Sequence, residues 1–258
     1  MKMTVLGTGT SFGVPQVGCS CDTCTSSDSR DRRTRVAAVF ENDDGAERLV
    51  VDTPPEFRLQ LVDNGIPDVV AVLYTHDHAD HVHGIDDLRA VSVRTGKLPL
   101  YGPAEVLERV RKRFSYIFDD GVKPPPGTSK PKLSTHPLEP GVPVSIAGMR
   151  VVPLECDHGD IRVFGYRVGD FGYLTDVKAV SDASLELLVG VRVLVINALF
   201  EEPHPTHLSI PESVALAQKI KAEKTFLTHL THRFRHIELE HRLPEGIAPA
   251  FDGLTVTL

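Results

Sequence analysis

Thr75-His76-Asp77-His78-Ala79-Asp80-His81 is the stretch of this sequence that decides the fold. It directly follows an apolar run, Val69–Tyr74, which is typical of a buried β-strand. The first two histidines share one side of an extended chain, so both can reach one metal ion. The second aspartate and the last histidine come after the chain turns and can bind a second ion. The pattern H-x-H-x-D-H therefore predicts a metal site at the end of a strand.

Three further metal-type residues follow at predicted strand ends. They are His158 in Cys156-Asp157-His158-Gly159, Asp176 in Tyr173-Leu174-Thr175-Asp176, and His229 in Leu227-Thr228-His229. Imidazole together with carboxylate suits zinc, manganese or iron, so the ligand types leave the metal open. The following histidines are predicted to be ordinary surface or core residues: His83, His136, His204, His236 and His241.

Three of the four cysteines, Cys19, Cys21 and Cys24, lie within six residues of one another. In a reducing compartment such a cluster is more typical of a metal site than of a disulfide framework, with free thiols or redox chemistry as the alternative. The stretch 13–35 has few large apolar residues, so a zinc ion would hold it to the rest of the chain where burial cannot. Cys156 stands alone in a predicted strand and is expected to be a packed core thiol.

The composition of the 258 residues is that of a globular protein, with 41% apolar residues and a formal net charge of −7. This balance argues against binding long nucleic acids, although a buried metal pair could still attract a small anionic substrate. No apolar run approaches the roughly 20 residues of a membrane span, and the first residues lack the apolar core of a signal peptide. We therefore expect a cytoplasmic protein without a membrane partner, and the sequence leaves open whether it forms a homodimer. Two short basic clusters, 30–35 and 109–113, are expected to be a solvated loop and a solvated helix face.

Short apolar strands alternate with helical patterns along the whole chain. The predicted strands are Lys2–Leu6, Val36–Glu41, Arg48–Asp52, Val69–Tyr74, Leu133–Leu138, Val142–Ile146, Arg150–Glu155, Val163–Val168, Phe171–Leu174, Val191–Ile196, Lys224–Leu227 and Leu254–Leu258. The predicted helices are Pro55–Asn64, His81–Thr95, Pro103–Phe118, Ser181–Val189 and Pro211–Lys221, and Asp119–Lys132 is a Pro- and Gly-rich loop. This layout predicts an αββα sandwich of two mixed sheets with helices outside, as a single domain over 1–258.

The H-x-H-x-D-H pattern, with a later His, Asp and His in this order, resembles the metallo-β-lactamase superfamily. The resemblance extends from Gly7-Thr8-Gly9-Thr10-Ser11 to His229, which is most of the chain. It implies that His76, His78 and His158 hold one metal ion. It also implies that Asp80, His81 and His229 hold the other, and that Asp176 bridges the two.

Four further motifs resemble the phosphodiesterase family of the carbon–phosphorus lyase pathway, which opens phosphoribosyl 1,2-cyclic phosphate. They are Cys19-Ser20-Cys21-Asp22-Thr23-Cys24, Gly84-Ile85-Asp86-Asp87-Leu88-Arg89, His204-Pro205-Thr206-His207-Leu208-Ser209 and His229-Leu230-Thr231-His232. The resemblance implies a structural zinc ion on Cys19, Cys21, Cys24 and His232. It places the family's catalytic histidine at His207, which we take as the proton donor to the leaving alkoxide.

The resemblance therefore implies a phosphodiesterase of phosphonate metabolism, in which a dinuclear-metal hydroxide attacks a small, cyclic phosphodiester. The two active-site ions would be Zn²⁺ or Mn²⁺. Two alternatives stay open. One is a different hydrolase of the same fold, such as a lactonase, thioesterase or β-lactamase, and the other is an accessory protein resembling the pyrroloquinoline quinone synthesis protein B.

Overall fold

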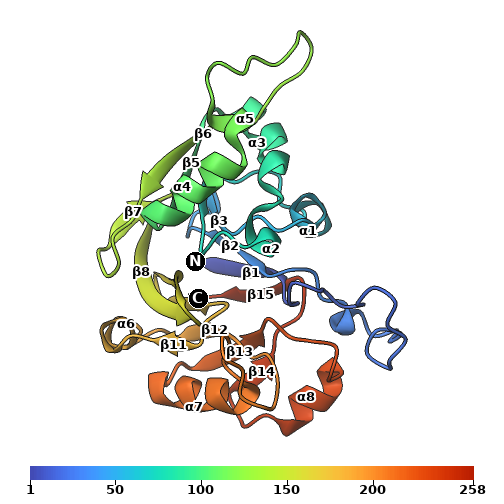
Figure 1. The fold of residues 1–258 in the computed structure, drawn as a ribbon. Coiled ribbons are helices and arrows are strands. Elements are labelled where there is room, and N and C mark those ends of the chain that lie inside the picture. The colour runs from blue at the N-terminus through green and yellow to red at the C-terminus, as the bar shows by residue number, and fades with distance from the viewer.

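Two β-sheets face each other at the centre of the computed structural model, which describes residues 1–258 (Figure 1). The first sheet has the strand order β15 (Leu254–Thr257), β1 (Lys2–Gly7), β2 (Ala37–Glu41), β3 (Arg48–Val51), β4 (Ala71–Leu73), β5 (Leu98–Gly102) and β6 (Leu133–Pro137). The second has the order β11 (Ala179–Val180), β8 (Met149–His158), β9 (Ile161–Val168), β10 (Phe171–Leu174), β12 (Val193–Asn197), β13 (Lys224–Thr228) and β14 (Ile247–Pro249), with β7 (Val144–Ile146) paired to β8. Each sheet contains both parallel and antiparallel pairs.

Helices cover the outer face of each sheet. The helices are α1 (Phe57–Asp63), α2 (Ala79–Val82), α3 (Leu88–Thr95), α4 (Ala104–Arg113), α5 (Ser115–Phe118), α6 (Asp182–Leu187), α7 (Ile210–Ile220) and α8 (His236–Arg242). Buried side chains from α1 to α5 pack on the first sheet, and those from α6 to α8 pack on the second. A third apolar cluster, which includes Phe40, Leu49, Val151 and Phe171, fills the space between the sheets. The structure thus confirms the predicted αββα sandwich, in which both faces of the central strands are buried.

One long predicted helix, His81–Thr95, is wrong, because the chain breaks at Gly84. Helix α2 ends before it, a short 3₁₀ turn follows it, and α3 begins at Leu88. The Gly84 amide donates to the Thr53 carbonyl oxygen at 2.8 Å. A Cβ at Gly84 would collide with the Pro54 carbonyl oxygen, so only glycine allows this close approach.

The C-terminal quarter holds two elements that the sequence patterns did not indicate. Helix α8 begins where Glu238 accepts from the Arg235 amide at 3.1 Å, and β14 adds a parallel strand beside β13. Both are short, and β14 ends in Pro249, a residue that is depleted in strands. The predicted helix 103–118 also divides, at Phe114, into α4 and α5.

The prediction that 30–35 is a solvated basic loop is wrong for one of its arginines. Arg33 is buried, its guanidinium donates to the carbonyl oxygens of Thr231 and Phe234, and it lies 3.4 Å from the Asp31 carboxylate. A buried guanidinium needs such partners, because an unpaired buried charge is strongly destabilising. Arg33 therefore fastens the N-terminal loop to the turn that carries His232.

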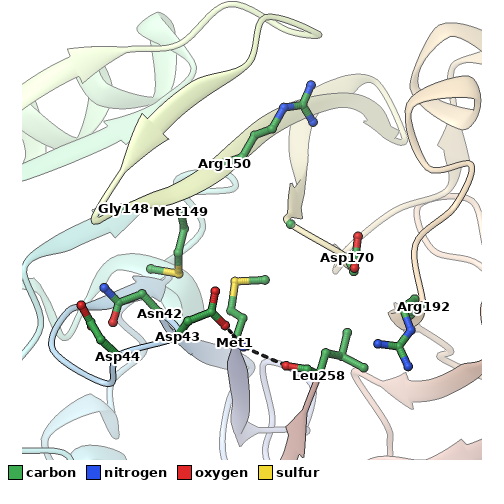
Figure 2. A pocket seen from close by; sticks show the side chains of 11 residues that line it. Met1, Asn42, Asp43, Asp44, Gly148, Met149, Arg150, Asp170, Arg192 and Leu258 are labelled. Atoms are coloured by element: carbon green, nitrogen blue, oxygen red, sulfur yellow. Dashed lines mark hydrogen bonds and ion pairs between the residues drawn. The ribbon is translucent and has the colours of Figure 1, made fainter.

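The two chain ends lie side by side in the paired strands β1 and β15. The Met1 amine donates to the Leu258 carbonyl oxygen at 2.9 Å and pairs with Asp43, at one side of a surface groove of about 560 Å³ (Figure 2). None of the helices combines the length and the apolar character that are needed to cross a membrane.

Candidate functional site

The predicted metal-type residues come together where strands of the two sheets end. His76, His78 and His81 lie in the segment after β4, and His158 is the last residue of β8. Asp176 follows β10 and His229 follows β13, two strands that both run parallel to β12. Parallel strands present their carboxyl ends at the same edge of a sheet, and this brings the last two residues together.

His76, His78 and His158 form one compact group of donors. Their donor nitrogens all lie within 4.8 Å of one another, and His76 Nε2 is 3.0 Å from His78 Nδ1. His158 Nδ1 is 2.7 Å from the Thr206 carbonyl oxygen. A carbonyl oxygen only accepts, so His158 carries its proton on Nδ1 and its Nε2 is free to bind a metal ion.

His81 and Asp176 form a second group together with His76, again within 4.8 Å. His81 Nδ1 is 2.7 Å from the Asp52 carboxylate, which fixes the proton on that nitrogen. His81 Nε2 is buried, has no hydrogen-bond partner and lies 3.3 Å from Asp176 Oδ2. A buried nitrogen with a free lone pair beside a carboxylate suits a cation.

Asp176 is the centre of the whole arrangement. Its Oδ1 lies 3.0 Å from His207 Nε2 and 3.1 Å from His229 Nε2. Burial alone would raise the pKa of Asp176, but its contacts with the imidazoles of His229, His81 and His207 outweigh burial and hold that pKa well below its usual value. The carboxylate is therefore ionised and can attract a metal ion on either side.

The other two predicted ligands, Asp80 and His229, each lie close to one residue of these groups. Asp80 Oδ2 lies 3.6 Å from His81 Nε2, and His229 lies against Asp176 as described. His229 also stacks on His207, with ring centroids 4.7 Å apart and planes at 16°. All seven predicted residues and His207 therefore share one location.

Three residues of this region have positive φ although none is glycine: Asp52 at 64°, Asp176 at 55° and His229 at 55°. Non-glycine residues rarely adopt this conformation, because it places Cβ too near the backbone. Each of the three stands directly after, or one residue beyond, the end of a strand, where the sharp turn aims its side chain into the cluster. Strain of this kind concentrates at functional sites.

A second group joins the N-terminal loop to the turn after β13. The Sγ atoms of Cys19, Cys21 and Cys24 lie 3.3, 3.5 and 3.5 Å from His232 Nδ1. Zinc–sulfur and zinc–nitrogen bonds in a tetrahedral site imply a separation of roughly 3.5 Å between such ligands. The four donors therefore have the spacing of a Cys₃His zinc site, and none of the cysteines forms a disulfide. Cys156 lies elsewhere, buried in β8, as a core thiol whose pKa burial raises to about 12.

Several residues that support the cluster were missed by the sequence patterns. Asp52 accepts from the amide and hydroxyl of Thr75 at 2.9 and 2.8 Å as well as from His81. An aspartate directly after a buried strand was the available signal for it. Thr206 left no signal, because it acts through its backbone oxygen.

The basic face of α4 is exposed as expected, and two of its arginines, Arg109 and Arg113, also contact Asp77. Arg109 Nε donates to Asp77 Oδ1 at 2.8 Å, and Arg113 Nη2 donates to Asp77 Oδ2 at 2.9 Å. Arg113 also donates to the Asp77 carbonyl oxygen. Both arginines therefore brace the residue that lies between two of the histidines while remaining exposed to solvent.

Comparison with known proteins shows which family shares the sequence and the fold of this chain. The model of the β-lactamase superfamily domain matches residues 47–230. A protein described as a new diphosphatase from the PhnP family has a crystal structure with a TM-score of 0.90 and 37% identity, covering 100% of this chain and 97% of that one. The crystal structure of zinc-bound PqqB from Methylobacterium extorquens has a TM-score of 0.80 at 20% identity, covers the whole of both chains, and shows a shared fold.

A longer relative comes from Porphyromonas gingivalis and is named octanoyltransferase. It is 38% identical over 259 residues, which cover 98% of this chain and 51% of that protein. The chain therefore spans about half the length of this curated relative.

Proposed function

The chain belongs to the metallo-β-lactamase superfamily as a PhnP-like member, and on that premise we propose that it is a metal-dependent hydrolase of small phosphodiesters. A cyclic phosphodiester such as phosphoribosyl 1,2-cyclic phosphate is the substrate we favour. The observation that carries this proposal is the position of His207. It is a histidine outside the ligand set, yet it reaches the same carboxylate as the ligands do.

Seven residues would hold two divalent ions. His76, His78 and His158 would bind one ion, and Asp80, His81 and His229 the other, with Asp176 between them. The fit rests on free nitrogen lone pairs: the Asp52 carboxylate and the Thr206 carbonyl oxygen leave the Nε2 atoms of His81 and His158 without protons. Bound ions would supply a nucleophile derived from water and would stabilise negative charge on the phosphate.

The residues of the chain itself have separate tasks in this proposal. His207 would donate a proton to the departing alkoxide, and its Nε2 faces the cluster at 3.0 Å from Asp176. Burial lowers the pKa of His207, which makes its protonated form a stronger acid. Thr206 holds the ring from the other side, with its hydroxyl 2.8 Å from His207 Nδ1.

We also infer that Cys19, Cys21, Cys24 and His232 bind a structural zinc ion. Their spacing supports it, and the buried Arg33 already fixes the turn that carries the histidine. The ion would tie the loop 13–35 to the C-terminal part of the same domain.

Two observations point to other substrate classes, which should be tested together with the cyclic phosphodiester. The solved PhnP-family relative is described as a diphosphatase, which points to a phosphoanhydride bond. The relative from P. gingivalis is named octanoyltransferase, which points to an acyl thioester. The same metal cluster could polarise either group.

Measuring turnover on a panel of candidate substrates would distinguish these possibilities. Metal-loaded protein would be assayed on phosphoribosyl 1,2-cyclic phosphate, bis(p-nitrophenyl) phosphate, a dinucleoside diphosphate, an octanoyl thioester and a lactone. We expect the highest kcat/KM on the cyclic phosphodiester. Turnover of the diphosphate alone would narrow the substrate to a phosphoanhydride, and turnover of only the thioester or lactone would refute phosphodiester hydrolysis.

The role of His207 is tested by the leaving group. A sugar alkoxide needs a proton to depart, whereas p-nitrophenolate leaves without help. His207→Ala is therefore expected to lower kcat on the cyclic phosphodiester by roughly 10²–10⁴-fold and to affect the aryl ester far less. His204→Ala, a nearby histidine that lies 3.4 Å from His207, is the matched control. A uniform loss on both substrates at unchanged metal content would make His207 a phosphate-positioning residue instead.

A further inference from the structure

Four basic side chains converge on a cavity of about 490 Å³ at the base of the loop between α5 and β6. They are Lys97, Arg111, Lys130 and Lys132, and the one carboxylate in the lining belongs to Asp120. The cavity therefore has an excess of positive charge in a chain whose formal net charge is −7. The loop itself projects from the top of the molecule in Figure 1.

None of these four cations forms an ion pair with a carboxylate, whereas several arginines elsewhere on the surface do. Arg192 and Arg233 each lie 2.8 Å from a carboxylate oxygen. In the cavity, by contrast, Lys130 Nζ donates to the Asp119 carbonyl oxygen at 2.6 Å, and Arg111 contacts only neutral groups. Like charges that line one cavity repel one another, and Asp120 can offset only one of the four, so an anionic ligand would relieve that repulsion.

The other lining residues add apolar surface and a hydroxyl group, and both suit an organic phosphate. Ile117 is buried at the cavity, and the ring of Phe118 lies 5.1 Å below the Arg111 guanidinium. Thr135 adds a hydroxyl group, which lies 3.5 Å from Arg111 Nη1. Ligand sites of this volume combine apolar surface with a few convergent polar groups.

The cavity and the metal cluster lie at opposite edges of the first sheet. Strands β4, β5 and β6 are parallel to one another. The metal-binding segment follows the carboxyl end of β4, whereas Lys97 and Lys132 directly precede the amino ends of β5 and β6. A molecule in the cavity is therefore not the substrate of the metal cluster.

The groove beside the chain ends offers no such excess of charge. Its Met1 amine already pairs with Asp43, and Arg192 at its rim pairs with Glu223, while Asp44 and Asp170 add further negative charge (Figure 2). This groove is larger than the basic cavity, but the balance of charges favours the basic cavity.

We propose that the cavity formed by α4, α5 and the start of β6 binds a small anion carrying a diphosphate group, separately from the metal cluster. The four cations and the Thr135 hydroxyl would contact the phosphates. Guanidinium and ammonium groups are the usual partners of phosphate oxygens in proteins.

Calorimetry with inorganic pyrophosphate on metal-loaded protein tests this site. Lys132→Glu and Arg111→Glu are each expected to weaken binding roughly tenfold or more at low ionic strength. Lys219→Glu makes the same charge change as Lys132→Glu on the exposed face of α7 and should leave the affinity unchanged. Pyrophosphate bound at the metal cluster would inhibit turnover of bis(p-nitrophenyl) phosphate, and that inhibition constant should be the same in all variants.

Unchanged affinity in both cavity variants would overturn the proposal, as would an equal loss in the Lys219→Glu control. If the variants altered only the inhibition constant, the metal cluster would be the binding site and the cavity would be refuted. ADP that binds more tightly than pyrophosphate, with the gain lost in Phe118→Leu, would identify a nucleotide, and equal affinities would identify the diphosphate alone. A single-stranded oligonucleotide that binds more tightly than either would refute a small-anion site.

Discussion

Asparagine at position 52 would test how the protein prepares His81 for a metal ion. Asp52 accepts three hydrogen bonds, from the Thr75 amide, the Thr75 hydroxyl and His81 Nδ1 at 2.9, 2.8 and 2.7 Å. Asp52→Asn keeps the size of the side chain but replaces one carboxylate oxygen with an NH₂ group. This group cannot accept a hydrogen bond, so one of the three donors loses its partner. The imidazole of His81 is then free to move its proton to Nε2, the nitrogen that would bind the metal.

The size of the effect follows from this one contact. A hydrogen bond to a charged partner contributes about 1.5–3 kcal/mol. Its loss corresponds to roughly 10–100-fold in affinity for one metal ion, the range known for groups that orient metal ligands. We expect the second ion, on the side of His78 and His158, to be held as in the wild type.

Competition with a chromophoric chelator would measure the two affinities. Asp252→Asn is the matched control, because Asp252 accepts from the Thr8 hydroxyl and from the amide and hydroxyl of Thr34 at 2.6–2.7 Å but contacts no histidine. If Asp52→Asn bound both ions as tightly as the wild type, the role we give to Asp52 would be wrong. An equal loss of metal in the control would point to general destabilisation instead.

Three further predictions concern other parts of the molecule. Asp80→Asn should lower kcat by roughly 100-fold, since it removes a ligand charge, whereas Asp77→Asn should cost less, and equal small losses in a steady-state assay would contradict the ligand assignment. Cys21→Ser should lose about one zinc ion by elemental analysis and melt at a lower temperature, while the other ions remain bound; full metal content and an unchanged Tm would rule out the structural ion. Burial raises the pKa of Asp252 to about 6, so the folded state holds that proton more tightly than the unfolded chain does. The stability of the wild type relative to Asp252→Asn should therefore fall by at most about 3 kcal/mol as the pH rises from about 4 to about 6, and urea unfolding at a series of pH values that showed a rise would contradict this sign.

The αββα fold and the location of the cluster were predictable because the relevant signals are local. H-x-H-x-D-H places its residues within six positions, directly after a buried strand, and the later His, Asp and His each follow strands of their own. The apolar pattern over Phe171–Leu174 predicted a strand with the same bounds that the structure shows.

Contacts between distant segments were not predictable in this way. Arg33 reads as one more cation in a basic loop, and only the fold brings it to Thr231 and Phe234. Asp77 lies between two histidines in the sequence, and only the fold brings Arg109 and Arg113 of α4 against it. In both cases the decisive partner lies more than 30 residues away, and side-chain type alone does not specify it.

Because the two chain ends are adjacent, the same fold could be formed by a chain that starts and ends at other residues. Because Met1 and Leu258 meet in neighbouring strands, a short linker could close the backbone into a ring without stretching either sheet. New ends could then be opened in the exposed residues 121–128, which lie outside every strand and helix. Such a circular permutant should keep the same layers and the same cluster, since strand pairing rather than the starting point of the chain defines them.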